Sequence, residues 1–278
     1  MRSRSFTGFA GVIGWPLEHT LSPVIHNAAF RSVGIDWVYL GWPVPPESLG
    51  AAIAGLRALG VMGVNVTMPH KEAVLEHCDE VSGDARDVGA VNTIQHIGGR
   101  LIGHNTDVDG FREFLLSDAG VDVTGRSALV LGAGGAARAV VKALADLGAG
   151  EISIAARRAE QVANIVPLGA GSAVALPWDE AVANVGRADV IVNATPLGTG
   201  GGDALSDPSF RSGQVVVDFV YDPPNTALVE RAREQGAEAW GGIGMLVHQA
   251  ASSFRIWTGQ DPALEVMSAA ALHAVLKQ

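Results

Sequence analysis

The chain is poor in cysteine, in basic residues and in long apolar runs, and each shortage excludes a class of protein. Only one of its 278 residues is a cysteine, Cys78, so no disulfide can form within the chain, which agrees with a reducing, cytoplasmic compartment. The 19 basic residues face 29 acidic ones, and the net charge of -10 argues against nucleic acid or an anionic membrane as partner. An anionic ligand would therefore need a local cationic site.

No stretch approaches the roughly 18 consecutive apolar residues of a membrane span. The apolar run after Arg2 and Arg4 is interrupted by Pro16, Glu18 and His19, too early for a signal peptide. The eight histidines show no spacing typical of metal ligands, so we expect no metal site. What the chain does have is 48% hydrophobic residues and 35 glycines, a composition that predicts a large core and many tight turns.

Short apolar runs alternate with helical patterns over the first hundred residues. Strands are expected at 9–15, 37–44 and 61–68, and helices at 22–34 and 46–59. Ser22 is expected to be the N-cap of the first helix, with Pro23 at its first position and Gly34 as its stop. Strands that alternate with helices pair in parallel through crossover connections. A hairpin is expected around Gly98 and Gly99.

A second α/β series follows an amphipathic helix expected at 107–120, along which we place a domain boundary. Its strands are expected at 127–133, 151–156, 172–176, 189–195, 214–220 and 236–240, with helices between most of them. This is the pattern of a doubly wound nucleotide-binding domain. The sequence therefore predicts an α/β protein with two domains, 1–107 and 108–242, and C-terminal helices at 243–278.

The run LVLGAGGAARAV contains a glycine-rich turn between a strand and a helix. Gly132, Gly134 and Ala137 fit the pattern G-x-G-x-x-A. The first glycine allows a tight turn, the second lets the backbone approach a pyrophosphate, and the small third residue lets helix and strand pack closely. The helix N-terminus supplies N–H groups and a partial positive charge for phosphate. The run predicts dinucleotide binding.

The end of the next strand indicates which dinucleotide is bound. An NAD site would have an acid there for the ribose 2′-hydroxyl, but the chain reads ISIAARR, with Arg157 and Arg158. Guanidinium groups bind a 2′-phosphate through charge-assisted contacts. We therefore expect NADP. The alternative is that both arginines are solvated at the start of a helix.

Lys71 ends a run, GVNVTMPHK, that reads as an apolar strand followed by a turn. Pro69 fits the first turn of a helix, so we expect Lys71 near the start of one. A desolvated lysine has a lowered pKa and can exchange protons near neutral pH. A solvated surface lysine is the alternative.

Polar residues lie at the ends of apolar strands in four segments of the first domain. They are Thr20, Ser22, Asn65, Thr67, Lys71, Asn92, Asn105, Thr106 and Asp107. Each alone could be a helix cap or a turn residue. Together, at the carboxyl ends of strands, they predict a site for a small, polyhydroxylated, anionic molecule. Lys71 and Asp107 could pass a proton to or from a substrate hydroxyl while hydride moves to or from a nicotinamide, which is alcohol–ketone oxidoreduction.

The chain resembles the shikimate dehydrogenase family over nearly its whole length. The successive blocks that carry the resemblance are GVIGWPLEHTLSPVIHNAAF, GVNVTMPHKEAV, GAVNT, GHNTDVDGF, LGAGGAARA, NATPLG, DFVYDPPNT and GIGMLVHQAASSFRIWTG. The resemblance implies NADPH-dependent reduction of 3-dehydroshikimate to shikimate in aromatic amino acid biosynthesis. It implies a substrate domain at 1–107, a Rossmann-like NADP domain at 108–242, and helices from 243–278 that return to the substrate domain.

The resemblance also implies a role for each matched residue. Lys71 and Asp107 match the catalytic pair, which acts at the C3 oxygen. The implied substrate ligands are Thr20 and Ser22 for the carboxylate, Thr67, Asn92 and Gln249 for ring hydroxyls, and Tyr221. The implied cofactor residues are Gly132, Ala133, Gly134, Gly135, Ala136, Arg157, Phe219 and Gly242. Arg158, because of its charge, and Thr195 are also expected in the cofactor site.

The chain departs from the family pattern at three places. Thr20 stands where serine is usual, and its added methyl in a tight site would cost about 1–3 kcal/mol. Ala156-Arg157-Arg158 replaces Asn-Arg-Thr, and Thr199 replaces a methionine. A paralogue that acts on quinate or an amino-shikimate, and a non-catalytic NADP sensor, are therefore the alternatives. A homodimer is a hypothesis that the sequence does not decide.

Overall fold

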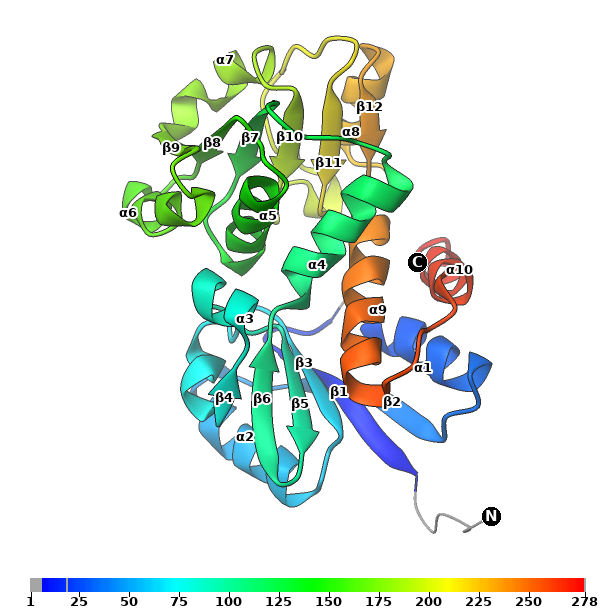
Figure 1. Cartoon of the computed structure of the whole chain (residues 1–278). Coiled ribbons are helices and arrows are strands. Elements are labelled where there is room, and N and C mark those ends of the chain that lie inside the picture. The colour runs from blue at the N-terminus through cyan, green and yellow to red at the C-terminus, as the bar shows by residue number, and fades with distance from the viewer. Residues whose placement is uncertain (1–6, 19, 278) are drawn as a thin grey trace. The chain divides into compact units, whose positions relative to one another are not determined.

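The computed structural model describes residues 7–18 and 20–277 (Figure 1). The chain divides into two compact units. The first unit comprises the described residues of Met1–Thr106 and Val247–Gln278, and the second comprises Asp107–Leu246. The chain thus leaves the first unit after Thr106 and re-enters it within the helix that contains Val247.

The first unit is built on a mixed six-stranded sheet in the order β2-β1-β3-β5-β6-β4. The strands are β1 Gly8–Gly14, β2 Trp37–Pro43, β3 Gly63–Val66, β4 Glu80–Val81, β5 Thr93–Ile97 and β6 Arg100–His104. β1 pairs in parallel with β2 and β3, as expected from the alternation of strands and helices. β5 and β6 form the predicted hairpin, and Gly98 and Gly99 at its turn both have positive φ, at 60° and 81°.

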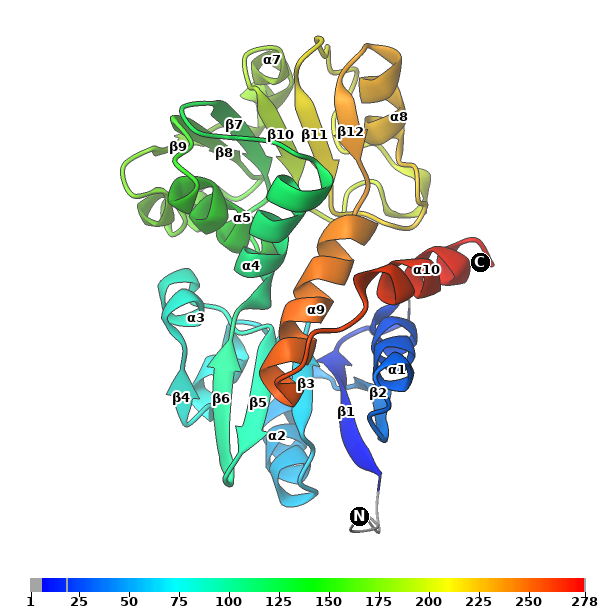
Figure 2. The ribbon, with the colours of Figure 1, turned by 45° about the vertical axis from the view of Figure 1, so that its right-hand side comes forward.

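Helices cover both faces of this sheet (Figure 2). They are α1 Ser22–Ser32, α2 Leu49–Ala58, α3 Gly83–Val88, α9 Ile243–Thr258 from Val247 onward, and α10 Leu264–Val275, with 3₁₀ turns at Pro46–Ser48 and Ala73–His77. On one face Ile53 of α2 packs in a core with Val64 and Val66 of β3. On the other face the rings of His26 from α1 and Trp257 from α9 contact Tyr39. The C-terminal helices therefore belong to the first unit.

The structure corrects two local predictions in this unit. Ser22 is the first residue of α1 rather than its N-cap, a position held by Leu21 without a side-chain hydrogen bond. Pro69 does not open a helix, because the residues after β3 form a turn and then a 3₁₀ helix from Ala73. The carbonyl of Lys71 accepts a hydrogen bond from the N–H of Val91, 2.7 Å away.

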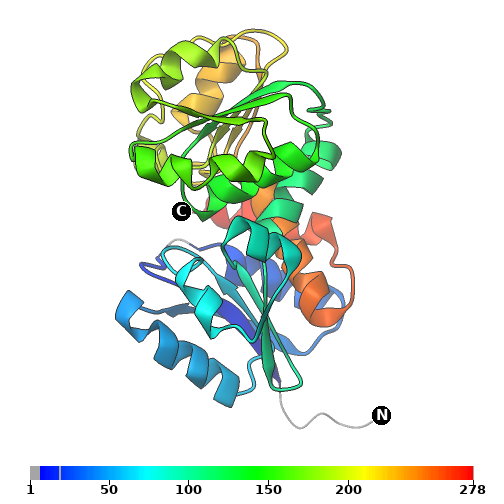
Figure 3. The ribbon, with the colours of Figure 1, turned by 60° about the vertical axis from the view of Figure 1, so that its left-hand side comes forward.

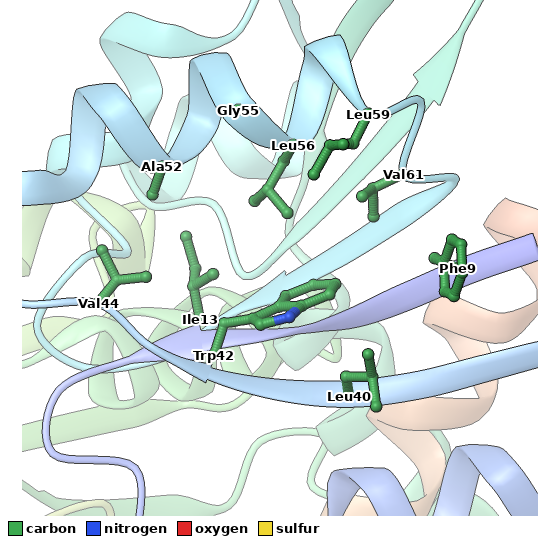
Figure 4. A pocket seen from close by; sticks show the side chains of 10 residues that line it. All are labelled: Phe9, Ile13, Leu40, Trp42, Val44, Ala52, Gly55, Leu56, Leu59 and Val61. Carbon is green, nitrogen blue, oxygen red and sulfur yellow. The ribbon is translucent and has the colours of Figure 1, made fainter.

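An apolar pocket of about 460 Å³ lies between α2 and strands β1 and β2 (Figure 4). Its lining includes Phe9, Leu40, Trp42 and Leu56, and no charged side chain contributes to it. It lies on the α2 face of the sheet, whereas Tyr39 points to the opposite face. The pocket therefore offers no groups for acid–base chemistry.

The second unit contains a doubly wound parallel sheet, as predicted, and its strand order is β12-β11-β10-β7-β8-β9. Its strands are β7 Ser127–Leu131, β8 Glu151–Ala155, β9 Ala173–Leu176, β10 Val190–Asn193, β11 Val215–Asp218 and β12 Glu238–Trp240. The order reverses between β7 and β10, and ligands of such sheets bind at this switch point. The predicted α/β class with a Rossmann-like half is confirmed.

Helices lie on both faces of this second sheet (Figure 3). They are α4 Thr106–Glu113, α5 Gly135–Asp146, α6 Ala159–Ala163, α7 Ala181–Val185 and α8 Ala227–Glu234, with a π-helical turn at Phe114–Asp118 and 3₁₀ turns at Val166–Gly169, Trp178–Glu180 and Thr199–Gly201. Gly120, with φ of +61°, follows the π-helical turn, close to the expected end of the helix at 107–120. None of the helices in the described residues is long and apolar enough to cross a membrane.

Candidate active site

Lys71 lies in a tight turn directly after β3 in the first unit. The N–H of His70 donates to the carbonyl of Thr67 at 3.0 Å, and Nε2 of the buried His70 ring hydrogen-bonds the carbonyl of Val44 at 2.6 Å. The carbonyl of Lys71 is itself held by Val91. These hydrogen bonds fix the backbone before and after Lys71. Its half-buried side chain therefore starts from a fixed position after β3.

Thr20 and Ser22 place two hydroxyl groups at the start of α1. The Thr20 hydroxyl accepts a hydrogen bond from the N–H of Ser22, with an O···N distance of 3.3 Å. Ser22 is buried and Thr20 is half-buried. Burial raises the pKa of Tyr39 well above its usual value, and a hydrogen bond with Ser22 opposes that rise. Two hydroxyls beside a helix N-terminus form a site suited to a carboxylate.

A buried hydrogen-bond cluster lies at the carboxyl end of β3 and the amino end of β5, which pair antiparallel. It consists of Asn65, Asn92, Thr93, Thr106 and Ser253, each less than a tenth exposed. Asn65 Nδ2 donates to the hydroxyls of Thr93 and Ser253 at 3.0 and 2.9 Å. Asn92 Oδ1 accepts from the N–H of Thr106 at 2.7 Å, and Asn92 Nδ2 donates to the Thr106 hydroxyl at 3.0 Å. Four chain segments, at 65, 92–93, 106 and 253, are thus joined by hydrogen bonds.

Helix α9 brings Gln249 to the same end of the sheet. Trp257 packs against Gly63 at the start of β3 and donates from Nε1 to the carbonyl of Ile94 at 3.0 Å. One turn earlier Ser253 contacts Asn65 in the middle of β3. Gln249 is one further turn toward the helix N-terminus, on the same face, and its side chain is half-buried. It therefore lies beyond Asn65 toward the carboxyl end of β3.

Asp107 begins the second unit and is buried, with 5% of its surface exposed. It is the second residue of α4, which starts at Thr106, so it is not the cap of that helix. Asn105, a turn candidate, uses its Nδ2 to donate to the carbonyl of Ala90 at 2.9 Å. The N–H of Thr106 is held by Asn92. This contact fixes the backbone of the residue that precedes Asp107.

The glycine-rich loop lies between β7 and α5 at the switch point of the second sheet. Gly132 has φ of +115°, and a Cβ there would lie 3.0 Å from the carbonyl oxygen of Ala194. Gly134 is the N-cap of α5, has no side chain to cap it, and would meet no protein atom within 4 Å if it carried a Cβ. Ala137 is fully buried. The loop leaves an open approach to the α5 N–H groups, which fits a pyrophosphate.

Arg157 and Arg158 follow β8, the strand next to β7, and both are exposed. Arg158 immediately precedes α6. Within the part of the chain that the structure describes, neither guanidinium group makes an ion pair or a side-chain hydrogen bond. Two cationic groups thus lie at the strand end where a dinucleotide ribose is bound in this fold.

A second buried network organises the loops after β10 and β11. Asn193 Oδ1 accepts from the Thr195 hydroxyl at 2.6 Å, and Asn193 Nδ2 donates to Asp218 Oδ1 at 2.8 Å. Asp218 Oδ2 accepts from the Thr226 hydroxyl at 2.6 Å. Burial raises the pKa of Asp218, and these hydrogen bonds oppose the rise. Thr195 is therefore held in place by residues that sequence reasoning did not select.

Phe219, Tyr221 and Gly242 lie beyond β11 and β12. The ring of Phe219 contacts that of Phe111 edge-on, with centroids 5.7 Å apart. A Cβ on Gly242 would clash with the backbone of Phe219, so only glycine fits there. Tyr221 is half-buried, and burial together with the charge of Asp222 raises its pKa.

The structure divides the predicted site residues between the two units. The first unit holds Thr20, Ser22, Thr67, Lys71, Asn92 and Gln249, and the second holds Asp107, Tyr221 and the predicted cofactor residues. Sequence reasoning missed Tyr39, Thr93 and Ser253, whose contacts span up to 188 positions and leave no local pattern. No cluster of three or more His, Cys, Asp or Glu residues able to hold a metal ion occurs in 7–18 and 20–277.

Comparison with known proteins finds three family profiles in the chain and related proteins over most of its length. Residues 12–94 match the family profile "Shikimate dehydrogenase substrate binding domain", 115–199 match "Shikimate / quinate 5-dehydrogenase", and 242–272 match "Shikimate 5'-dehydrogenase C-terminal domain". The chain is 44% identical to the shikimate dehydrogenase (NADP(+)) of Methanopyrus kandleri over 276 residues, 96% of this chain and 95% of that protein.

Solved structures agree with this result. A crystal structure of a shikimate dehydrogenase in complex with NADP+ matches with a TM-score of 0.90 and 37% identity, covering 97% of this chain and 96% of the other. The Thermus thermophilus shikimate 5-dehydrogenase in complex with NADP(H) and shikimate matches with a TM-score of 0.86 and 36% identity, covering 96% and 100%.

Proposed function

Because this chain belongs to the shikimate dehydrogenase family, we propose that it is an NADP-dependent oxidoreductase that interconverts 3-dehydroshikimate and shikimate. The relatives named above are NADP-dependent, and one solved relative binds NADP(H) together with shikimate. The observation that carries the proposal is the turn after β3, which fixes Lys71 in the same unit as the Thr20 and Ser22 hydroxyls. In aromatic amino acid biosynthesis this reaction would lead toward chorismate.

In this proposal the first unit holds most of the substrate. Thr20 and Ser22 bind its carboxylate at the N-terminus of α1, where the helix dipole favours an anion. Thr67, Asn92 and Gln249 bind ring hydroxyls, and they follow β3, precede β5 and lie on α9. Tyr221 matches a further substrate-binding residue of the family.

Lys71 and Asp107 carry the proton transfer. As the ketone is reduced, the Lys71 ammonium group donates a proton to the C3 oxygen, and in the reverse reaction the neutral amine accepts it. Asp107, the second member of the pair, is proposed to assist this transfer. When bound, NADPH supplies the hydride.

The cofactor residues all belong to the second unit. The backbone of Gly132, Ala133, Gly134, Gly135 and Ala136 would hold the pyrophosphate at the start of α5, which this open loop fits. Arg157 and Arg158 would bind the 2′-phosphate through charge-assisted hydrogen bonds. Thr195, Phe219 and Gly242 would line the nicotinamide end.

Steady-state rates with shikimate and quinate, each with NADP and NAD, test this function. We expect the highest kcat/KM with shikimate and NADP. A quinate rate equal to or above the shikimate rate would instead favour a quinate-acting paralogue, a possibility that Thr20 raises because its methyl lies at the proposed carboxylate site. Equal rates with both cofactors would refute the role of the two arginines.

A Lys71→Ala variant tests the proton-transfer role. We expect kcat to fall by about 10²–10⁴-fold, the usual contribution of a general acid–base group. Binding of NADP to the variant, followed by fluorescence titration, should be unchanged because Lys71 is not among the cofactor residues. Full turnover in the variant would refute the assignment, and loss of NADP binding would indicate misfolding instead.

We further propose a cytoplasmic location and treat a homodimer as a hypothesis. The single cysteine supports a reducing compartment. Light scattering at micromolar concentration would measure the oligomeric state, and a mass of 28.7 kDa would exclude the dimer.

A further inference from the structure

Asp218 is a carboxylate at the carboxyl end of β11, immediately before Phe219. It is fully buried. Its Oδ1 accepts the N–H of Val220 at 3.0 Å and Nδ2 of Asn193 at 2.8 Å, and its Oδ2 accepts the Thr226 hydroxyl at 2.6 Å. Three donors therefore surround the side chain. Hydrogen bonds donated to a carboxylate favour its ionised form.

Main-chain groups fix the orientation of the Asn193 amide. Its Oδ1 accepts the main-chain N–H of Thr195 at 3.1 Å, and its Nδ2 donates to the main-chain carbonyl of Leu197 at 2.9 Å. A main-chain N–H only donates and a main-chain carbonyl only accepts, so the amide cannot be turned around. Asp218 therefore faces the nitrogen of Asn193, which can only donate to it.

No cation balances this buried charge. Within residues 7–18 and 20–277, no lysine or arginine forms an ion pair with Asp218, and the influences on its pKa are burial and its hydrogen bonds. Thr226 is the N-cap of α8, and the start of that helix supplies only a partial positive charge, roughly half a unit. A buried carboxylate without a full counter-charge is costly, which points to a role toward a ligand.

The partners of Asp218 belong to the wall of the proposed nicotinamide site. The side chain of Asn193 accepts the Thr195 hydroxyl at 2.6 Å, and its main-chain carbonyl accepts the N–H of Phe219 at 2.9 Å. Thr195 and Phe219 are two of the residues proposed to line the nicotinamide end. The Asp218 carboxylate is joined to Thr195 through one side chain, and Phe219 is its neighbour in the chain.

We propose that Asp218 places a negative charge behind the wall of the nicotinamide site, and that this charge favours binding of NADP+ over binding of NADPH. The proposal rests on the proposed function, in which Thr195 and Phe219 line that site. Asp218 reaches the site only through these neighbours. It is therefore a residue that sets cofactor preference, not a catalytic residue.

The two forms of the cofactor differ in the charge of one ring. The nicotinamide ring of NADP+ is positively charged and the dihydronicotinamide ring of NADPH is neutral, whereas their phosphate groups are the same. A nearby anion therefore attracts the oxidised ring alone and repels the phosphates of both forms equally. The ratio of the two dissociation constants isolates the interaction with the ring. Because the carboxylate is buried, salt screens this attraction less than it would screen a surface pair.

Asp218→Asn tests the proposal because it keeps the shape of the side chain and removes its charge. The Asn oxygen can accept the N–H groups of Val220 and Asn193, and its nitrogen can donate to the Thr226 oxygen. We expect the Kd of NADP+ divided by the Kd of NADPH to rise at least about fivefold over wild type. Isothermal titration calorimetry with each cofactor alone, at about pH 8, measures both constants. Asp218→Ser removes the same charge with a smaller side chain and should shift the ratio in the same direction.

Two control variants separate the charge from the structure around it. Thr226→Val breaks the same network and removes the α8 N-cap, so it should lower stability. It keeps the carboxylate, so the ratio of dissociation constants should stay as in wild type. Asp179→Asn removes an exposed charge from the same unit, where solvent screens it, and should also leave the ratio unaltered. Circular dichroism checks that each variant is folded.

The outcomes distinguish this inference from the function beneath it. If folded Asp218→Asn and Asp218→Ser bind both cofactors with the wild-type ratio, the proposed charge effect is wrong and the proposed function stands. An equal rise of the ratio in Thr226→Val would also overturn the inference, because the network and not the charge would then set the preference. If the wild-type protein binds neither NADP+ nor NADPH, the proposed function itself fails.

Discussion

Tyr39 joins two properties in one side chain: its ring stacks on His26, with centroids 4.4 Å apart, and its hydroxyl donates to Asn65. Tyr39→Phe keeps the ring and removes the donor. We expect the free energy of unfolding to fall by about 1–3 kcal/mol, because the Asn65 oxygen loses its partner in a buried site. The KM for shikimate should rise several-fold, while the KM for NADP should not change.

Urea denaturation and steady-state kinetics check this prediction. Stability is measured without ligand, and the two KM values are measured separately. A purely structural role for the hydroxyl would lower stability and leave the KM for shikimate unaltered. No change in either quantity would show that Asn65 is held by its other contacts alone.

His26 is fully buried, and burial lowers its pKa to about 3. The unfolded chain takes up a proton near the ordinary value of 6.5, whereas the folded protein excludes it down to about pH 3. The stability due to neutral His26 is therefore complete above pH 6.5 and decreases as the pH falls toward 3. We expect His26→Phe, which preserves a ring, to have a flatter stability profile across this range.

Unfolding by urea at a series of pH values measures both profiles. His273→Gln is the matched control for the loss of a histidine, since His273 is exposed on α10. Parallel slopes for wild type and His26→Phe would contradict the prediction.

At the scale of elements, two glycines of one loop have different roles: Gly132 matters for stability and Gly134 for NADP binding. Gly132 has φ of +115° and no room for a Cβ beside Ala194, whereas Gly134 has space around it. Gly132→Ala should lower stability by more than about 1 kcal/mol, because strain and a close contact combine. Gly134→Ala should fold normally, yet bind NADP at least tenfold more weakly, because its Cβ would occupy the approach of the phosphate.

Thermal denaturation without ligand and fluorescence titration with NADP compare the two variants. Each serves as the control for the other. An equal loss of stability in Gly132→Ala and Gly134→Ala would contradict these different roles. Unaltered NADP binding in Gly134→Ala would place the pyrophosphate elsewhere.

The elements were largely predictable because their signals are local. The strands of both sheets other than the two-residue β4, which was not predicted, the hairpin at Gly98 and the glycine loop each depend on residues close together in sequence. The N-cap at Ser22 and the helix at Pro69 were predicted wrongly, because competing contacts decide them. In the second case the partner, Val91, lies twenty positions from Lys71. Tyr39 and Ser253 could not be found at all, since only tertiary packing brings them to Asn65.

At the scale of the whole molecule, the chain carries a net charge of -10 and yet is proposed to bind two anions. Local groups must therefore overcome an unfavourable overall field. The structure provides two such sites in separate units: the hydroxyls at the start of α1 in the first, and the α5 N-terminus with Arg157 and Arg158 in the second. Shikimate should therefore stabilise the protein through the first site and NADP through the second.

Ligand-induced stabilisation tests this division of the molecule. A ligand at 100 times its Kd stabilises the folded state by about 2.7 kcal/mol. In the double variant Arg157→Ala/Arg158→Ala we expect at least tenfold weaker NADP binding, so the same NADP concentration should give only about 1.4 kcal/mol. Stabilisation by shikimate should remain as in wild type.

Ser22→Ala should show the converse: stabilisation by shikimate should be reduced and stabilisation by NADP should be unchanged. Thermal shifts with each ligand alone measure all four cases. If either variant lost both responses together, the two sites could not be assigned to separate units.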